Sequence, residues 1–425
     1  MSDLLPNYQE SISKEELRIL NYFWLGFILY TSAFTILTTQ QLGTIWKICY
    51  LIQILGLIIL VPTAFLLIKM KFDNEYLKVI YSIYILWLIS VVIRGFLFDI
   101  HFIMKMLFNS YEGAVIYFSP ILLLFPRNLL YIKKAINVIL ILGIIYTIYS
   151  ILFIRHLLMP YNIQNSQDIL EYFSKTLSIP CGFVLLTYIY HSNKKNLTAL
   201  FVLILTFIFA IFRARRALAY LVLWPIIITY IIYLNYSKRY ILKFLIFLIL
   251  ASSITILVAS WQNIMGYLSD NSATSWFIDR IGQDSRSEVE QYFFRDLKPI
   301  DWIIGKGING KYFCPGISEG VGQVSIYRSG IETDYLTIIL KGGIIFLGLK
   351  LLIAIPAIFK GLFRSKNLLS KAAGIWILFY LIDLYPAPVT TFSLNYLLVW
   401  ISIGICYSWK LRNMSDNNIK EVLSG

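Results

Sequence analysis

Three arginines, Arg213, Arg215 and Arg216, stand together between two long apolar segments of the sequence. The planar guanidinium group keeps its charge and can donate two parallel hydrogen bonds to phosphate oxygens. One interpretation is that this cluster recognises a phosphate or pyrophosphate group at a membrane surface. The alternative is that these arginines contact lipid headgroups or form salt bridges between loops.

Two acidic residues, Glu332 and Asp334, precede another long apolar segment and lie close to a further arginine, Arg328. The helix dipole favours acidic side chains near a helix start, so both residues could serve only to begin a solvated helix. A carboxylate beside a cationic site could instead act as a general base that removes a proton from a hydroxyl group. The sequence is compatible with both interpretations.

Residues 305–310 match the pattern G-x-G-x-x-G. A dinucleotide site needs a strand before this pattern and a helix after it. Here residues 311–316 follow, and they contain Pro315 and Gly316, so they cannot open a helix. We therefore expect a tight turn whose backbone angles require glycine, not a nucleotide site.

The composition identifies a membrane protein. Of the 425 residues, 58% are hydrophobic and only 14% are charged, whereas a soluble domain has about 25% charged residues. The net charge of +14 does not indicate nucleic-acid binding, because the basic residues punctuate the ends of apolar runs. That distribution is a signal of membrane topology.

The apolar runs predict an all-α, polytopic integral membrane protein with about twelve membrane-spanning helices of roughly 20 residues each. The expected helices are 20–37, 46–68, 76–94, 112–126, 133–154, 176–191, 197–212, 216–235, 240–260, 335–359, 371–386 and 389–409. Lys and Arg concentrate in the short segments that lie inside if the N-terminus is cytoplasmic. Both termini are therefore expected in the cytoplasm.

This topology divides the chain into three parts. Residues 1–260 hold the first nine helices, 261–334 form one large loop outside the cytoplasm, and 335–425 hold the last three helices and a cytoplasmic tail. The loop is rich in aromatic residues, unlike disordered linkers, so we expect it to be folded and packed back on the membrane domain. A helix is expected at 285–297 within it. The arginine trio falls on the outer side, where arginine is disfavoured.

Four other residues leave their roles open. Asp383, inside a predicted helix, and Glu112, at the start of another, are candidate functional acids, because ionisable residues inside a membrane are costly. Each could also simply face water. Cys181 and Cys314 both fall near the outer side and could form a disulfide bond.

Three sequence segments together carry a resemblance to a known family. Residues 212–219 (FRARRALA) form an arginine-rich turn that opens a helix. Residues 292–310 combine Arg295, aromatic residues and the Gly-x-Gly pattern, and 331–343 join two acids to a glycine pair. In this order the segments resemble the O-antigen polymerases, within the wider superfamily of O-antigen ligases and polymerases.

The resemblance implies a metal-independent glycosyltransferase of the bacterial cytoplasmic membrane, working on its outer face without a cofactor. Such enzymes join oligosaccharide repeat units carried on undecaprenyl pyrophosphate, and they transfer the growing chain to a hydroxyl group of the next unit. The expected partners are the lipid-linked oligosaccharide, membrane lipids and, as a further candidate, a chain-length regulator protein. No nucleic acid is expected.

The expected chemistry assigns roles to the charged residues. A pyrophosphate leaving group needs positive charge where negative charge develops, and the incoming hydroxyl group needs a base. The candidate catalytic residues are Arg216, Glu332 and Asp334. The candidate pyrophosphate-binding residues are Arg213, Arg215, Arg295 and Arg328.

Two alternative functions stay open. Ligases of the superfamily typically carry a histidine near the end of the loop, where this chain has Glu332 and Asp334, which favours a polymerase over an O-antigen ligase. The other alternative is a transporter, such as a lipid-linked oligosaccharide flippase. Transporters often show internal repeats, and no repeat is evident here.

Overall fold

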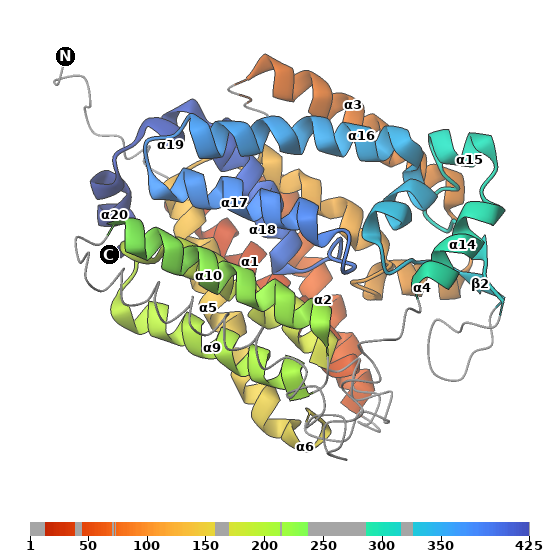
Figure 1. Ribbon diagram of the computed structural model, residues 1–425, viewed down its shortest axis with the longest axis horizontal. Coiled ribbons are helices and arrows are strands. Elements are labelled where there is room, and N and C mark those ends of the chain that lie inside the picture. Colours follow the sequence, from red (N-terminus) through yellow and green to blue (C-terminus); the bar gives the residue numbers. More distant parts are fainter. Residues whose placement is uncertain are drawn as a thin grey trace, which may run out of the picture.

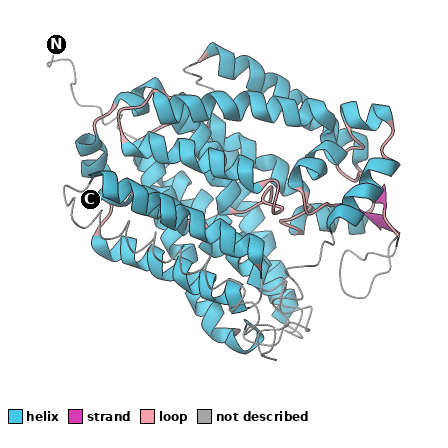
Figure 2. Ribbon diagram, in the orientation of Figure 1, coloured by secondary structure: helices cyan, strands magenta, loops and turns pink. Residues whose placement is uncertain are grey.

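The computed structural model describes residues 13–38, 45–69, 72, 74–157, 170–212, 215–236, 286–315 and 326–424. Helices dominate these residues, and the β-structure within them is one two-stranded antiparallel sheet (Figure 2). The predicted all-α class is therefore confirmed.

Seven helices of the described part are long and apolar enough to cross a membrane. This number is compatible with a multi-pass membrane protein. The seven are α1 (Lys14–Leu37), α2 (Ile45–Leu66), α3 (Glu75–Gly95), α5 (Leu129–Leu152), α9 (Asn193–Phe212), α10 (Arg216–Tyr236) and α16 (Asp334–Phe363). Two shorter helices, α17 (Leu368–Asp383) and α18 (Leu394–Tyr407), pack against α16 and against each other.

Two of the expected helices have a different form in the structure. Residues 112–126 contain η1 (Ala114–Leu124), a 3-10 helix with Pro120 inside it. Residues 176–191 contain three short pieces, which are η2 (Ser174–Ser178), α8 (Cys181–Leu186) and η3 (Tyr188–Tyr190). Pro180 lies between the first two and has no N–H for a helical hydrogen bond. The expected helix at 240–260 lies outside the described residues.

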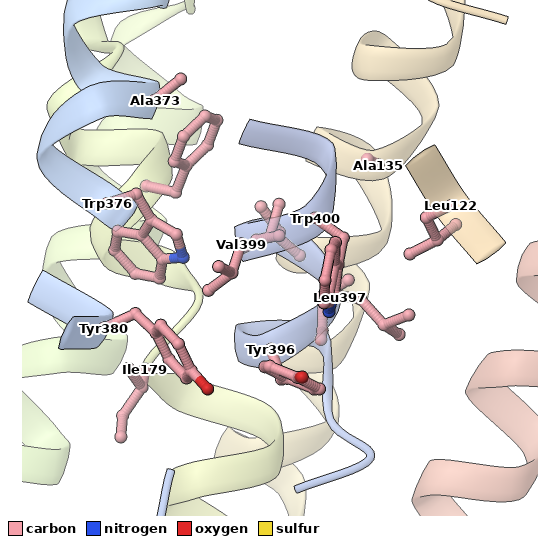
Figure 3. Close-up of a cluster of buried hydrophobic side chains, with 14 of the residues drawn as sticks. Leu122, Ala135, Ile179, Ala373, Trp376, Tyr380, Tyr396, Leu397, Val399 and Trp400 are labelled. Atoms are coloured by element: carbon pink, nitrogen blue, oxygen red, sulfur yellow. The ribbon is translucent and has the colours of Figure 1, made fainter. Parts of the chain in front are cut away.

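The core of the bundle consists of large buried side chains from helices far apart in the sequence. Figure 3 shows Trp376 and Tyr380 of α17 facing Tyr396 and Trp400 of α18. Tyr380 and Tyr396 have ring centroids 5.5 Å apart. This aromatic layer continues to Tyr84 of α3, whose ring lies 5.5 Å from that of Trp400.

Short elements gather at the two ends of the bundle (Figure 1). One end carries α4 (Ile100–Phe108), α14 (Arg286–Asp296), α15 (Pro299–Ile304), β1 (Tyr312–Phe313) and β2 (Tyr327–Arg328). The opposite end carries α19 (Trp409–Asn413) and α20 (Asp416–Ser424). The elements from the expected loop and the C-terminal helices therefore lie far apart. One further short helix, α6 (Ile154–Leu157), follows α5.

The described part of the expected loop is folded and packs on the bundle. Val289 and Phe293 of α14 share a buried apolar cluster with Tyr312 and with Ile339 and Leu340 of α16. The helix predicted at 285–297 is confirmed as α14. Burial of these side chains joins the loop to the start of α16.

A break in α16 receives the glycine-rich turn. Gly343 has φ 73° and ψ 179°, a conformation that interrupts the helix and is almost confined to glycine. The carbonyl groups of Leu340 and Lys341 accept hydrogen bonds from Lys306 N (2.7 Å) and Gly307 N (2.9 Å). Gly305 and Gly307 themselves have φ values of 73° and 81°. The predicted glycine turn is thus confirmed, and it occupies the break in α16.

Candidate functional site

A cavity of about 250 Å³ lies where the loop elements meet the start of α16. Three residues singled out from the sequence, Arg328, Glu332 and Asp334, line it together. The other lining residues are Tyr84, Tyr111, Glu112, Ile116, Tyr117, Tyr172, Ser329, Gly330, Ile331, Thr337, Ile338, Lys341, Phe346, Lys350, Pro388, Thr390 and Tyr396.

Glu332 is the most accessible of the three acids in this cavity. Its side chain is 49% exposed, and its Oε2 lies 2.7 Å from Nε of Arg286. Arg286 also donates to the carbonyl oxygen of Pro386 at 2.7 Å. Arg286 therefore links α14 both to Glu332 at the cavity wall and to the connection between α17 and α18.

Asp334 lines the same cavity but is only 3% exposed. Its Oδ2 accepts hydrogen bonds from the backbone N–H groups of Val389 (3.1 Å) and Thr390 (2.7 Å). Its own N–H donates to the carbonyl oxygen of Leu384. Asp334 thereby ties the start of α16 to the segment before α18, so it is better placed to position the site than to take up a proton.

Glu112 enters the cavity from a distant part of the sequence. Its carboxylate forms an ion pair with Lys105 of α4 and accepts a hydrogen bond from Ser329 Oγ at 3.0 Å. Burial alone would raise the pKa of this carboxyl, but the ammonium groups of Lys105 and Lys341 and the Ser329 hydroxyl lower it below its usual value. Glu112 thus joins α4 to the loop as a carboxylate.

The lowered pKa of Glu112 predicts a loss of stability in acid. Because ionisation favours the folded protein, this contribution is complete above the ordinary value of 4.5 and is lost as the pH falls through the lowered pKa. We expect the difference in thermal stability between wild type and Glu112→Gln to shrink as the pH is taken below 4.5. Melting curves of the purified protein measure this. Glu75→Gln, at an exposed acid on α3, should melt like wild type at every pH.

Arg215, whose side chain the structure describes, lies near the cavity but does not line it. Arg215 lies 3.5 Å from Glu171, which also pairs with Lys175. The charge of Arg286 acts on Glu171 as well, and the neighbouring Tyr172 lines the cavity. Glu171 therefore lies within electrostatic reach both of Arg215 and of Arg286, which pairs with Glu332 at the cavity wall.

The other predicted arginines have different positions. Arg216 begins α10, beside Arg215, but its side chain lies outside what the structure describes, as does the whole of Arg213. Arg328 lies on β2 and lines the cavity. Arg295 is exposed on α14 and does not line the cavity.

Two lysines of α16 line the cavity and were missed by the sequence analysis. Lys341 donates from Nζ to the carbonyl oxygen of Gly310 at 2.8 Å, and Lys350 donates to the Tyr380 hydroxyl at 3.0 Å. The signal that could have revealed them is a lysine inside a long apolar segment, which is costly in a membrane.

Acidic and basic residues are equal in number in the cavity lining, and positive charge exceeds negative charge once the ion-pair partners behind the lining are included. Its acids and their ion-pair partners, within the described ranges, comprise Glu112, Glu332, Asp334, Lys105 and Arg286. Arg328, Lys341 and Lys350 add further positive charge. The excess favours binding of an anionic ligand.

The remaining candidates lie elsewhere. Asp383 ends α17, is half-buried and is not among the cavity-lining residues. Cys181 and Cys314 are both buried, and no disulfide bond joins them.

The arrangement combines what a group transfer from an anionic leaving group requires. Cations can stabilise the departing negative charge, and the accessible carboxylate of Glu332 can accept a proton from an attacking hydroxyl group.

Comparison of the chain with protein-family models, with curated proteins and with solved structures gives no match.

Proposed function

We propose that this chain is a polysaccharide polymerase that joins oligosaccharide repeat units carried on undecaprenyl pyrophosphate. The observation that carries the proposal is the convergence of Arg328, Glu332 and Lys341 in one charged cavity, with Arg215 of the arginine turn close by. Cavities between the helices of a bundle are common ligand sites. The resemblance to O-antigen polymerases supplies the identity of the substrate.

The proposal includes a topology of about twelve membrane helices in the bacterial cytoplasmic membrane, with both termini in the cytoplasm and the loop outside. The distribution of Lys and Arg supports this orientation. The separation of α14 and α15 from α19 and α20, at opposite ends of the bundle, is consistent with it (Figure 1). In this orientation the cavity lies near the outer face of the cytoplasmic membrane.

The proposed reaction is a direct glycosyl transfer. A hydroxyl oxygen of one lipid-linked repeat unit attacks the anomeric carbon that joins the growing chain to its pyrophosphate. A new C–O bond forms, the bond to the pyrophosphate oxygen breaks, and undecaprenyl pyrophosphate leaves with that electron pair. Glu332 accepts the proton of the attacking hydroxyl group, and Arg215, Arg216 and Arg328 stabilise the departing charge.

A deletion strain complemented with variants tests this function. We expect the deletion to reduce the surface glycan ladder to single repeats and the wild-type chain to restore it. Arg216→Ala should fail to restore it, because loss of one transition-state cation costs about 100-fold or more in rate. The readout is the ladder on a gel, with membrane insertion of each variant checked by immunoblot.

Other ladders would reject the proposal. If the polymer persists in the deletion strain but is detached from its anchor, the chain is a ligase. An unchanged surface glycan in the deletion strain would contradict both the polymerase and the ligase function. A full ladder from correctly inserted Arg216→Ala would show that Arg216 is not part of the site. Lys14→Ala, in the first turn of α1, is the control and should restore the ladder.

A further inference from the structure

The inner end of the cavity is built around a buried lysine. Lys350 of α16 is only 4% exposed, and its Nζ donates a hydrogen bond to the Tyr380 hydroxyl at 3.0 Å. Across the described ranges no carboxylate lies within 4.0 Å of this nitrogen. A buried ammonium group without a paired anion is costly, so its retention in an apolar helix needs a reason.

The acid on which the charge of Lys350 acts, Asp334, is already hydrogen-bonded. The Oδ2 atom of Asp334 accepts two backbone N–H groups, from Val389 and Thr390. Thr390 in turn shares a hydrogen bond of 2.9 Å with the Tyr380 hydroxyl, which also accepts the bond from Lys350. This series of hydrogen bonds fixes the ammonium group of Lys350 at the cavity wall without bringing a carboxylate into direct contact with it.

Aromatic rings form the walls of this inner end. The Nζ atom of Lys350 lies 5.8 Å from the ring centroid of Phe346, 5.6 Å from that of Tyr380 and 5.2 Å from that of Tyr396. Tyr84 stacks on Phe346 at 5.3 Å. Figure 3 shows Tyr380 and Tyr396 side by side, on α17 and α18. These contacts orient the lysine and leave aromatic surface facing the cavity.

A ligand for this end must combine three features. It needs an anionic group for Lys350, an apolar face for the rings, and hydroxyl groups for partners such as Tyr84, Tyr117 and Thr390. A carboxylated pyranose has all three, because one face of the sugar ring presents C–H bonds. A bare phosphate group has no apolar face to place against the rings.

The size of the cavity agrees with this choice. Pockets for drug-sized ligands measure roughly 300–1,000 Å³, whereas this cavity measures about 250 Å³. It can therefore hold one sugar residue but not a whole oligosaccharide.

We infer that the inner end binds a carboxylated sugar residue, such as a uronic acid, of the lipid-linked repeat unit. The sugar carboxylate pairs with Lys350, and the C–H face of its ring packs on Phe346 and Tyr396. The inference rests on the proposed function, since it names the sugar class that this site selects. The pyrophosphate group then lies at the outer end, towards Arg328 and the arginine turn.

Calorimetric titration of the full-length protein in lipid nanodiscs tests this inference. The probes are D-glucuronate, D-glucose and inorganic pyrophosphate, added separately. We expect wild type to bind glucuronate more tightly than glucose by roughly 10- to 100-fold, as a charge-assisted hydrogen bond provides. Lys350→Met should lose this preference, and Lys350→Arg should retain part of it.

Lys360→Met is the matched control. Lys360 lies on the same helix and also over a tyrosine ring, at 4.1 Å from the centroid of Tyr407, but it does not line the cavity. This variant should keep the preference of wild type for glucuronate. The comparison of the two sugars on wild type needs no variant, so it is decisive even if Lys350→Met fails to fold.

Several outcomes would overturn the inference. These are undetectable glucuronate binding by wild type, equal binding of the two sugars, or a preference that survives in Lys350→Met. Lys350-dependent binding of pyrophosphate but not of glucuronate would assign the inner end to the leaving group. A Lys350-dependent preference for glucuronate in a chain that forms no glycan ladder would support this site and reject only the polymerase function.

Discussion

Replacing Glu332 by glutamine is expected to stop chain extension, with polymer yield falling by about 100-fold or more. The side chain keeps its size and can still contact Arg286, but it can no longer accept the proton of the attacking hydroxyl group. The glycan ladder of the complemented deletion strain measures the effect. The repeat-unit substrate should accumulate at the same time.

Two further variants separate proton transfer from a structural role of Glu332. Arg286→Gln breaks the same half-exposed ion pair, and such pairs contribute only about 0–1 kcal/mol, so the ladder should shorten much less. Glu288→Gln, at an exposed acid of α14, should leave it unchanged. Equal losses in Glu332→Gln and Arg286→Gln would show that Glu332 only anchors α14.

Replacing Gly343 by alanine is expected to disrupt the junction between α16 and the loop. An added Cβ atom would lie 2.0 Å from the carbonyl oxygen of Ile303, and the backbone has a φ of 73° that L-residues rarely adopt. Strain and overpacking together should lower the stability by about 2–5 kcal/mol. Melting of the purified protein, followed by fluorescence, measures the loss.

The matched control is Gly348→Ala, five residues further along α16. An added Cβ atom there meets nothing within 4 Å. Alanine is also the better helix former by about 1 kcal/mol, so this variant should melt at or above the temperature of wild type. If both variants melt alike, the glycine turn does not depend on the break in α16.

Long apolar segments made much of the fold predictable. The runs that became α2 and α3 are helical within two residues of their expected bounds, whereas α1, α5 and α9 begin four to six residues earlier than expected. The helix α14 and the glycine turn were also predicted, because capping, proline and glycine signals act locally. Local signals of this kind do not depend on the rest of the chain.

The helix types at 112–126 and 176–191 were not predictable in the same way. Apolar composition reports burial, but it does not distinguish an α-helix from the 3-10 helix of η1 or from the broken run around Pro180. Surrounding helices bury these segments and stabilise their irregular backbone. Tertiary packing therefore decided their form.

Part of the site was visible because Arg328, Glu332 and Asp334 are close in sequence. Glu112 was noticed as an acid, but its hydrogen bond to Ser329 joins positions 217 residues apart, which no local pattern reveals. Lys341 and Lys350 were hidden in an apolar run whose break at Gly343 is evident only in the structure. The sequence thus identified charged candidates, and the fold determined which of them meet.

Reconstitution of the purified chain in proteoliposomes tests the polymerase function most directly. The liposomes contain a single undecaprenyl-pyrophosphate-linked repeat unit, and no nucleotide sugar is added. We predict products of two or more repeat units, one undecaprenyl pyrophosphate released for each new linkage, and neither product with Glu332→Gln. Repeat units that stay single with the wild-type chain, or that lengthen equally with Glu332→Gln, would contradict the account.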